Sequence, residues 1–596
     1  MTSGLSSAAP APEGSTFQYG PALKSTEVAH AAVSECFQAI GVHAQPDADG
    51  SCPTGYQRKI DGAYVWAGAR SGDHAYFGTL SNAFCQATAG LIGQPGPHLV
   101  EDQNVCEFGE SSGAAVYGPK MGDLRKPQVL RVNADTQQTE DITPDDPLLE
   151  NVVGLRGAAA ANDVVFMFGV KYPTLNDSRL GLAVFAFEGS TGKYLGSQLR
   201  TDLYSARGGI EGPDGNLYLA ARRAPVAGDT TGGLGGVIER WTGTKSDPFH
   251  FETVAVLQND AGYLSTFGNR LVVSGWMGTL PDKKSAAVGG PSKIWMSPEI
   301  PAGGLTSADK DSWTSVFSWD QYDPDPVLGK SVVWGGITEW RGDLYVGSYN
   351  HAGVTATESL WNAYGQPATE AARILDVTKS NRATAIFKIS KPGTPEQKVT
   401  VLYGDRALPV YNPETKLWGN KPNLLGQTPK FGASGFGNPF NIYSWTFQVF
   451  QDKLYMATAD MSGSLMATAF SVDAAYDVSD ATVTSLEKVI GPTLFNTIGG
   501  GDVWRMDDPE KPAVAETLTG FGNHAQHGVR VFLPFEDKGV LYAGMGGGYN
   551  LRDGDNSKGG WSVNALKPGT PRTPLTFTLP NGALQGLLGA GTLTVG

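Results

Sequence analysis

The stretch VWGGITEWRGDLYVGSYNH, residues 333–351, decides the fold of this chain. It predicts two short strands joined by a tight turn at Arg341-Gly342-Asp343. Apolar and aromatic residues recur in both arms, and glycine lies where the backbone turns or packs closely. The second arm, residues 343–347, has counterparts at residues 75–78, 165–169, 216–220, 270–274, 453–457 and 540–544. The chain therefore carries seven copies of one small β unit.

Each copy is too small to bury both faces of its own sheet, so neighbouring copies must stack. Small sheets that repeat radially and close into a ring form a β-propeller, which also leaves few exposed edges. We therefore expect an all-β fold, a seven-bladed β-propeller with long inter-strand insertions near residues 352–380, 404–440 and 462–500. A β-helix or several β-sandwiches are the alternatives.

The N-terminal part differs from the repeats. Val28, Ala31 and Phe37 fall on one face of a helix over residues 26–42, which predicts a small disulfide-tied helical appendage. The expected boundaries are 1–24 for a flexible leader, 25–59 for the N-terminal helix and disulfide-tied segment, 60–570 for the propeller, and 571–596 for a ring-closing strand and a Gly/Leu-rich tail.

Composition excludes some classes of partner. The net charge of −14 argues against a nucleic-acid-binding surface, which is normally basic. The sequence has no apolar run of about 18 residues and thus no expected membrane span. The first ten residues lack a basic start and an apolar core, so the sequence shows no signal peptide.

The four cysteines lie in the first fifth of the chain. An even, clustered number predicts disulfides and an oxidising compartment, so we expect a secreted, periplasmic or cell-surface protein. Nearest-neighbour pairing gives Cys36–Cys52 and Cys85–Cys106. A zinc site built from all four is the rival, although no two of them have the close spacing that such sites use.

The propeller geometry predicts where a site lies. Residues just before the first strand and just after the second strand of each unit meet at one mouth of the central channel, where loops on a rigid scaffold commonly carry binding groups. The alternative is that aromatic rings merely fill the channel and arginines bond to backbone carbonyls. The predicted ligand-binding residues are Arg156, Arg207, Arg222, Arg223, Trp276, Trp334, Tyr349, Asn350, Trp445 and Asp460, with Tyr263 and Tyr443 at corresponding positions.

Two metal sites are also predicted. His351, His524 and His527 fall near the same mouth and offer three imidazoles to a transition metal. Asp553, Asp555 and Ser557 place oxygen ligands at alternate positions, as in a calcium loop, but without the glutamate at the twelfth position of an EF-hand. Ordinary hydrogen-bonded histidines and a polar turn are the alternatives.

Three functions fit these patterns. The first is a secreted propeller that binds a polar, anionic or carbohydrate-like ligand, a small molecule or a glycan, at the channel mouth. The second is a secreted enzyme at the same mouth, either a metal-dependent oxidoreductase or a glycan-cleaving enzyme, with its catalytic residues unassigned. The third is a surface or assembly protein. The glycine runs at 499–501 and 546–548 are better explained as packing glycines than as nucleotide-binding loops.

Overall fold

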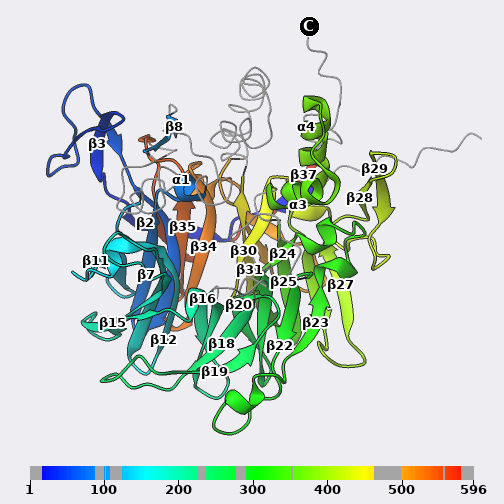
Figure 1. The fold of residues 1–596 in the computed structure, drawn as a ribbon, viewed down its shortest axis with the longest axis horizontal. Helices are drawn as coiled ribbons and strands as arrows, with labels where there is room; N and C mark the ends of the chain where they lie inside the picture. Colours follow the sequence, from blue (N-terminus) through cyan, green and yellow to red (C-terminus); the bar gives the residue numbers. More distant parts are fainter. Residues whose placement is uncertain are drawn as a thin grey trace, which may run out of the picture.

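The structure is a computed structural model that describes residues 16–87, 99–100, 103–107, 124–224, 235–276, 290–350, 354–461, 499–554 and 558–578. Strands dominate it, and the few labelled α-helices lie at one end of them (Figure 1). None of the helices in the described ranges combines the length and apolar character that a membrane crossing requires.

Each repeat forms an antiparallel hairpin in which an inner strand is followed by its partner. The hairpins are β6 (Gly62–Ser71) with β7 (His74–Ser81), β12 (Val152–Ala161) with β13 (Val164–Lys171), β16 (Leu203–Glu211) with β17 (Leu217–Arg223), β20 (Asp260–Phe267) with β21 (Arg270–Trp276), β24 (Val333–Trp340) with β25 (Asp343–Tyr349), β30 (Asn441–Phe450) with β31 (Lys453–Asp460), and β34 (Gln526–Phe535) with β35 (Val540–Gly547).

Two outer strands continue each hairpin into an antiparallel sheet. In the same order they are β10 (Val129–Asn133) and β11 (Thr139–Asp141), β14 (Gly181–Glu188) and β15 (Tyr194–Arg200), β18 (Gly236–Trp241) and β19 (Phe251–Val256), β22 (Lys293–Met296) and β23 (Thr314–Ser318), β26 (Ile386–Ser390) and β27 (Lys398–Tyr403), β32 (Val503–Met506) and β33 (Val514–Thr517), and β36 (Ser562–Pro568) and β2 (Leu23–His30).

The inner strands lie side by side in a closed cycle. β6 is followed by β12, β16, β20, β24, β30 and β34, and β34 contacts β6 again. A radial arrangement of small antiparallel sheets around such a cycle is a β-propeller, which confirms the predicted fold type.

The turn of the opening stretch has the predicted form. Trp340 pairs with Asp343, so Arg341 and Gly342 alone form the loop, with φ of 50° and 80°. Positive φ at both positions matches the hairpin turn that suits twisted strands. The Arg341 guanidinium is 2.7 Å from the Asp452 carboxylate in the next hairpin, which ties neighbouring sheets together at this end.

The N-terminus corrects the predicted helix. Residues 26–42 contain most of β2, all of β3 (Glu35–Ala39) and the start of β4 (Val42–Ala44), and β3 also pairs with β5 (Gln57–Lys59). The ladder between β2 and β36 overrides the helical spacing of the apolar residues, because a strand of the last sheet needs this partner. The predicted leader is also too long, since β1 (Thr16–Tyr19) lies within it, and residues 1–15 lie outside the described residues.

The first and the last described strands join the ring. β1 runs parallel to β33 and antiparallel to β37 (Leu575–Thr578), whereas β2 completes the neighbouring sheet. Residues near both termini therefore bridge two adjacent sheets. The rest of the predicted C-terminal tail lies outside the described residues.

The remaining elements lie in the connections. Those after β7 and β25, which contain α1 (Ala83–Ala87), α3 (Val354–Tyr364) and α4 (Glu370–Ser380), lie at the upper end of the strands in Figure 1. The other described elements are β8 (Leu99–Val100), β9 (Val105–Cys106), the hairpin of β28 (Ala407–Asn412) and β29 (Leu417–Pro422), and 3-10 turns at Leu149–Asn151, Ser307–Asp309, Trp319–Gln321, Leu328–Lys330, Ser434–Gly437, Gly520–Gly522 and Glu536–Lys538.

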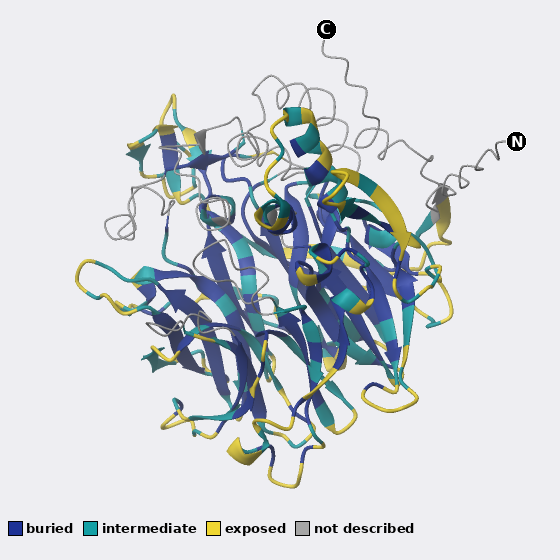
Figure 2. Ribbon diagram, turned by 45° about the vertical axis from the view of Figure 1, so that its right-hand side comes forward, coloured by how far each residue is buried: buried dark blue, intermediate teal, exposed yellow. Residues whose placement is uncertain are grey.

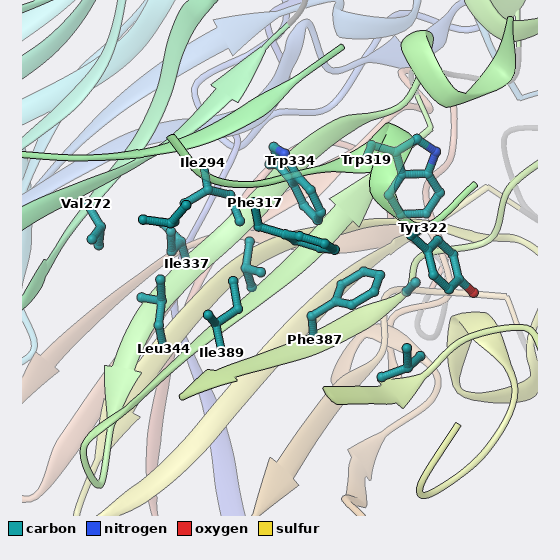
Figure 3. Close-up of a cluster of buried hydrophobic side chains, with 14 of the residues drawn as sticks. Val272, Ile294, Phe317, Trp319, Tyr322, Trp334, Ile337, Leu344, Phe387 and Ile389 are labelled. Carbon is teal, nitrogen blue, oxygen red and sulfur yellow. The ribbon is translucent and has the colours of Figure 1, made fainter. Parts of the chain in front are cut away.

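The core lies between the sheets. Figure 2 shows buried strands and exposed turns at their ends. One cluster joins Phe317, Trp334 and Phe387 from adjacent sheets (Figure 3), and the Trp334 side chain is fully buried. The disulfides Cys36–Cys52 and Cys85–Cys106 pair as predicted, which removes the four-cysteine zinc site.

Candidate binding site at the channel mouth

Three arginines from different sheets converge at the centre of the ring. They are Arg156 of β12, Arg207 of β16 and Arg530 of β34. The Arg207 guanidinium carbon lies 3.1 Å from the centroid of the Trp276 ring, and that of Arg156 lies 5.5 Å from the same ring. The repeat in the sequence predicts Arg156 and Arg207 at the mouth but does not indicate Arg530.

Aromatic side chains surround these arginines. The Tyr349 and Tyr443 rings stack with centroids 3.6 Å apart, and the Tyr443 and Tyr263 hydroxyls are 2.7 Å apart. Arg207 donates to both of those hydroxyls, at 3.5 Å to Tyr263 and 3.4 Å to Tyr443, and Arg530 donates to the Tyr263 hydroxyl. The Arg530 guanidinium carbon also lies 5.7 Å from a ring centroid of Trp445. The guanidinium groups thus lie against ring faces and phenol oxygens.

A β-bulge explains how these side chains reach the centre. The ladder between β12 and β13 skips Arg156, the ladder between β16 and β17 skips Arg207, and the ladder between β34 and β35 skips Arg530. The same irregularity falls at Trp66 in β6 and at Trp445 in β30. A bulge adds one unpaired residue and re-aims its side chain, so each of these strands presents the extra residue to the channel.

The other inner strands obey the same rule. In β20 the irregular segment contains Tyr263, and in β24 it consists of Gly335 and Gly336. A Cβ atom at Gly335 would collide with the Ser444 carbonyl oxygen of the neighbouring inner strand. Glycine is therefore required here by the close approach of β24 and β30.

The arginine cluster has an unbalanced positive charge. Among the described residues, no carboxylate lies within 4.0 Å of the guanidinium nitrogens of Arg156, Arg207 or Arg530. Burial, followed by the charges of Arg207 and Arg530, lowers the pKa of Arg156 to about 9, and burial lowers the pKa of Arg207. Because guanidinium groups stay protonated in proteins, this environment favours an anion.

An acidic residue lies close by. Asp260, 7% exposed, pairs with Arg222 at 3.1 Å, and Arg222 itself lies beside the Tyr204 ring. Burial raises the pKa of Asp260, although Arg222, a backbone hydrogen bond from Gly235, and then Arg156 and Arg207 act in the opposite direction. Arg222 is thus a predicted site residue whose charge faces a protein carboxylate. Arg223 is the last residue of β17, and its backbone N–H donates to the Gly235 carbonyl oxygen.

Two of the three predicted metal-binding histidines, His527 and His524, have protein partners. His527 Nε2 is 2.7 Å from the Tyr64 hydroxyl, and the His527 ring stacks on Trp445. Burial lowers the pKa of His527 to about 4, so its ring is neutral at pH 7. His524 Nδ1 lies 2.7 Å from the Gly499 carbonyl oxygen, and His351 lies outside the described residues. The three-histidine metal site stays a prediction.

Three further predicted residues are tied into the scaffold. Trp334 is fully buried and donates its indole N–H to the Ser292 carbonyl, so it belongs to the core and not to the channel wall. Asn350 is fully buried and donates to the Asn381 side chain at 3.1 Å. Asp460 is fully buried and accepts a 2.7 Å hydrogen bond from Asn438.

The predicted calcium loop lies only in part within the described ranges and stays a prediction. Asp553 lies 2.6 Å from Arg58, and Asp555 and Ser557 of the predicted calcium loop lie outside the described residues. Elsewhere, Glu35, His43 and Glu107 bring one ligand atom each within 4.8 Å of one another. The buried Lys59 ammonium contacts Glu35 at 2.6 Å and Glu107 at 2.9 Å, so a cationic side chain already neutralises this group.

No protein-family model matches the sequence, and no curated protein sequence matches it. Solved structures with a similar arrangement include one described as YCF48 bound to D1 peptide, at 8% identity and a TM-score of 0.36, covering 95% of this chain and 100% of that one. The GH74 xyloglucanase from Xanthomonas campestris is 10% identical with a TM-score of 0.35, and the match covers 91% of this chain and 55% of that one. Trypanosoma rangeli sialidase in complex with sialic acid is 8% identical with a TM-score of 0.33, and the match covers 74% of this chain and 57% of that one. At such scores the likenesses assign no ligand or activity to this chain.

Proposed function

We propose that this chain is a secreted, seven-bladed β-propeller that binds an anionic, carbohydrate-like ligand at the mouth of its central channel. The blade number is supported by the cycle of inner strands from β6 to β34, each of which begins an antiparallel sheet. Secretion is supported by the two disulfides, which persist in oxidising compartments.

One observation carries the ligand proposal. Arg156, Arg207 and Arg530 converge, and no carboxylate of the described residues lies within 4.0 Å of them. Gathering like charges away from water is costly unless an opposite charge compensates them. Arginine also presents a planar fork of donors that matches the geometry of a carboxylate or a sulfate.

The aromatic lining supports the carbohydrate-like part of the proposal. Tyr263, Trp276 and Tyr349 are each half-buried, so a ligand in the channel can reach them. Flat ring faces pack against the apolar faces of sugar rings, while the Tyr263 and Tyr443 hydroxyls offer hydrogen bonds.

Calorimetric titration tests the proposal. The probes are acetate, sulfate and D-glucuronate, with D-glucose as the uncharged comparison. The wild-type protein is expected to bind at least one of the anions at one site per chain and to bind it more weakly as salt rises. Arg207→Ala removes one guanidinium group and is expected to weaken that binding about tenfold or more.

Arg341→Ala is the matched control, since Arg341 lies in a turn at the other end of the strands and pairs with Asp452. It should leave the affinity unchanged. The proposal fails if none of the three anions binds the wild-type protein, or if both variants weaken binding equally.

A further inference from the structure

The central arginine cluster has an acidic residue with an unused oxygen at its side. A backbone hydrogen bond from Gly235 acts on the Asp260 carboxylate, but within the described part of the chain its Oδ1 atom has no hydrogen-bond partner, and the residue is only 7% exposed. The other carboxylate oxygen, Oδ2, lies 3.1 Å from Arg222 Nε. A buried carboxylate oxygen without a partner is costly and calls for an explanation.

Several contacts place Asp260 in the binding cluster. Asp260 opposes Trp276 across the β20–β21 ladder. The guanidinium groups of Arg156 and Arg207 both lie over the Trp276 ring. Arg156 in turn donates to the Ser205 hydroxyl at 3.0 Å, and Ser205 opposes Arg222 in the β16–β17 ladder. Arg156 and Arg207 are also among the charges that act on the Asp260 carboxyl. The acid and the arginines thus belong to one group of contacts.

The two kinds of residue favour different parts of a ligand. The arginines attract an anionic group, whereas a carboxylate repels one and accepts hydrogen bonds from hydroxyl groups. Asp260 is already neutralised by Arg222, so it does not cancel the charge of the other three arginines. A simple inorganic anion would leave Asp260 Oδ1 without a donor, but a hydroxylated acid would supply one.

We propose that the ligand is a hydroxylated ring acid of the uronic-acid class, and that Asp260 selects it by accepting a hydrogen bond from a ligand hydroxyl while Arg156, Arg207 and Arg530 hold its carboxylate. This inference rests on the proposed anion-binding function and narrows it. Asp260 is a specificity residue in this account and takes no part in any reaction.

A matched pair of probes tests this assignment. D-glucuronate and cyclohexanecarboxylate both carry one carboxylate on a six-membered ring, but only the first has ring hydroxyls. Calorimetric titration of the wild-type protein is expected to give at least about tenfold tighter binding of D-glucuronate, since a buried acceptor rejects a ligand that lacks the matching donor. Equal affinity for the two probes would overturn the inference, with no variant needed.

The variant Asp260→Asn then distinguishes recognition of the ligand hydroxyl by Asp260 from a purely structural role of this residue. The amide keeps the shape but removes the negative charge and weakens the acceptor. D-glucuronate should bind about fivefold or more weakly, whereas cyclohexanecarboxylate should bind as well as before or more tightly, because a repulsive charge is gone. Equal weakening of both probes would show a structural role and contradict the inference.

The two proposals fail in different ways. If neither carboxylate binds the wild-type protein and acetate and sulfate do not bind either, the proposed function is wrong. If both probes bind, lose affinity in Arg207→Ala and yet are not distinguished by the wild-type protein, only the role of Asp260 is wrong. Should Asp260→Asn fail to fold, the wild-type comparison of the two probes still decides.

Discussion

The Arg207 guanidinium carbon lies 3.1 Å from the centroid of the Trp276 ring, although the two residues belong to neighbouring sheets. Arg207 is the bulged residue of its inner strand, and Trp276 is the last residue of β21 in the next sheet. This contact holds the positive charge of Arg207 against the aromatic face of Trp276, at the centre of the ring of sheets. Trp276 also donates its indole N–H to the Trp334 carbonyl at 2.9 Å, which fixes the ring that supports Arg207.

Replacing Trp276 tests whether this support matters for binding. Trp276→Ala should weaken binding of D-glucuronate by about 1–2 kcal/mol, because a desolvated cation–π contact has about that value and Arg207 loses its fixed position. Trp276→Phe keeps a ring face and loses the indole hydrogen bond, so it should lie between the wild-type protein and Trp276→Ala. Calorimetry measures both. Identical affinity for all three proteins would contradict a positioning role.

Arg530 should be unfavourable for stability and favourable for binding. It is 3% exposed and carries a charge beside two other arginines. Arg530→Met keeps much of the side-chain volume, so the free energy of unfolding should stay within about 1 kcal/mol of the wild-type value or rise, because buried charges are often replaced without loss. Affinity for D-glucuronate should fall at least about tenfold. Denaturant unfolding and calorimetry give the two quantities, and a strong loss of stability with unchanged affinity would contradict this role.

Trp334 should behave in the opposite way. Its ring is buried between Phe317, Trp319 and Phe387, so Trp334→Ala should lower the free energy of unfolding by about 3–5 kcal/mol. The remaining folded protein should bind D-glucuronate with nearly the wild-type affinity. Chemical denaturation measures the stability, and calorimetric titration at low temperature measures the affinity. A Trp334→Ala variant of normal stability that no longer binds D-glucuronate would show that Trp334 belongs to the binding site and not to the core.

His527 predicts a dependence of stability on pH. Burial lowers its pKa from 6.5 to about 4, so the unfolded chain takes up a proton at a higher pH than the folded chain does. The contribution to stability is present above pH 6.5 and is lost as the pH falls towards 4, by about 3 kcal/mol in total. His527→Gln should remove this part of the pH dependence in denaturant titrations between pH 7 and 4. An unchanged pH profile would show that His527 is not buried and neutral.

The repeat in the sequence predicts the hairpins and the end of the strands at which Arg156, Arg207, Trp276, Tyr349 and Trp445 gather. It does not predict the bulges. A bulge adds one residue to a strand and shifts the alternation of side chains, so Arg530, the extra residue of β34, reaches the centre. Trp334 is paired with Ser348 just before the irregular segment of β24, and its side chain lies in the core. A bulge is defined by the pairing of two strands, so the sequence of one strand alone does not indicate where the extra residue lies.

Long-range pairing explains the other error. Residues 23–30 become a strand because β36, more than 500 positions later, needs an outer partner, and local spacing contains no trace of that contact. One missed signal was present in the sequence, since GFGN occurs at both 435–438 and 520–523. In each case the phenylalanine and its flanking glycines have positive φ, just before the inner strands β30 and β34. That repeat marks equivalent positions in two neighbouring sheets.

The central claim is that an anion binds among Arg156, Arg207 and Arg530. A crystal structure of the wild-type protein with D-glucuronate, at a concentration that saturates it in solution, tests this most directly. We predict the ligand carboxylate within hydrogen-bond distance of at least two of these guanidinium groups. D-glucuronate that binds in solution but lies elsewhere on the protein, with the three arginines contacting no ligand, would contradict the claim.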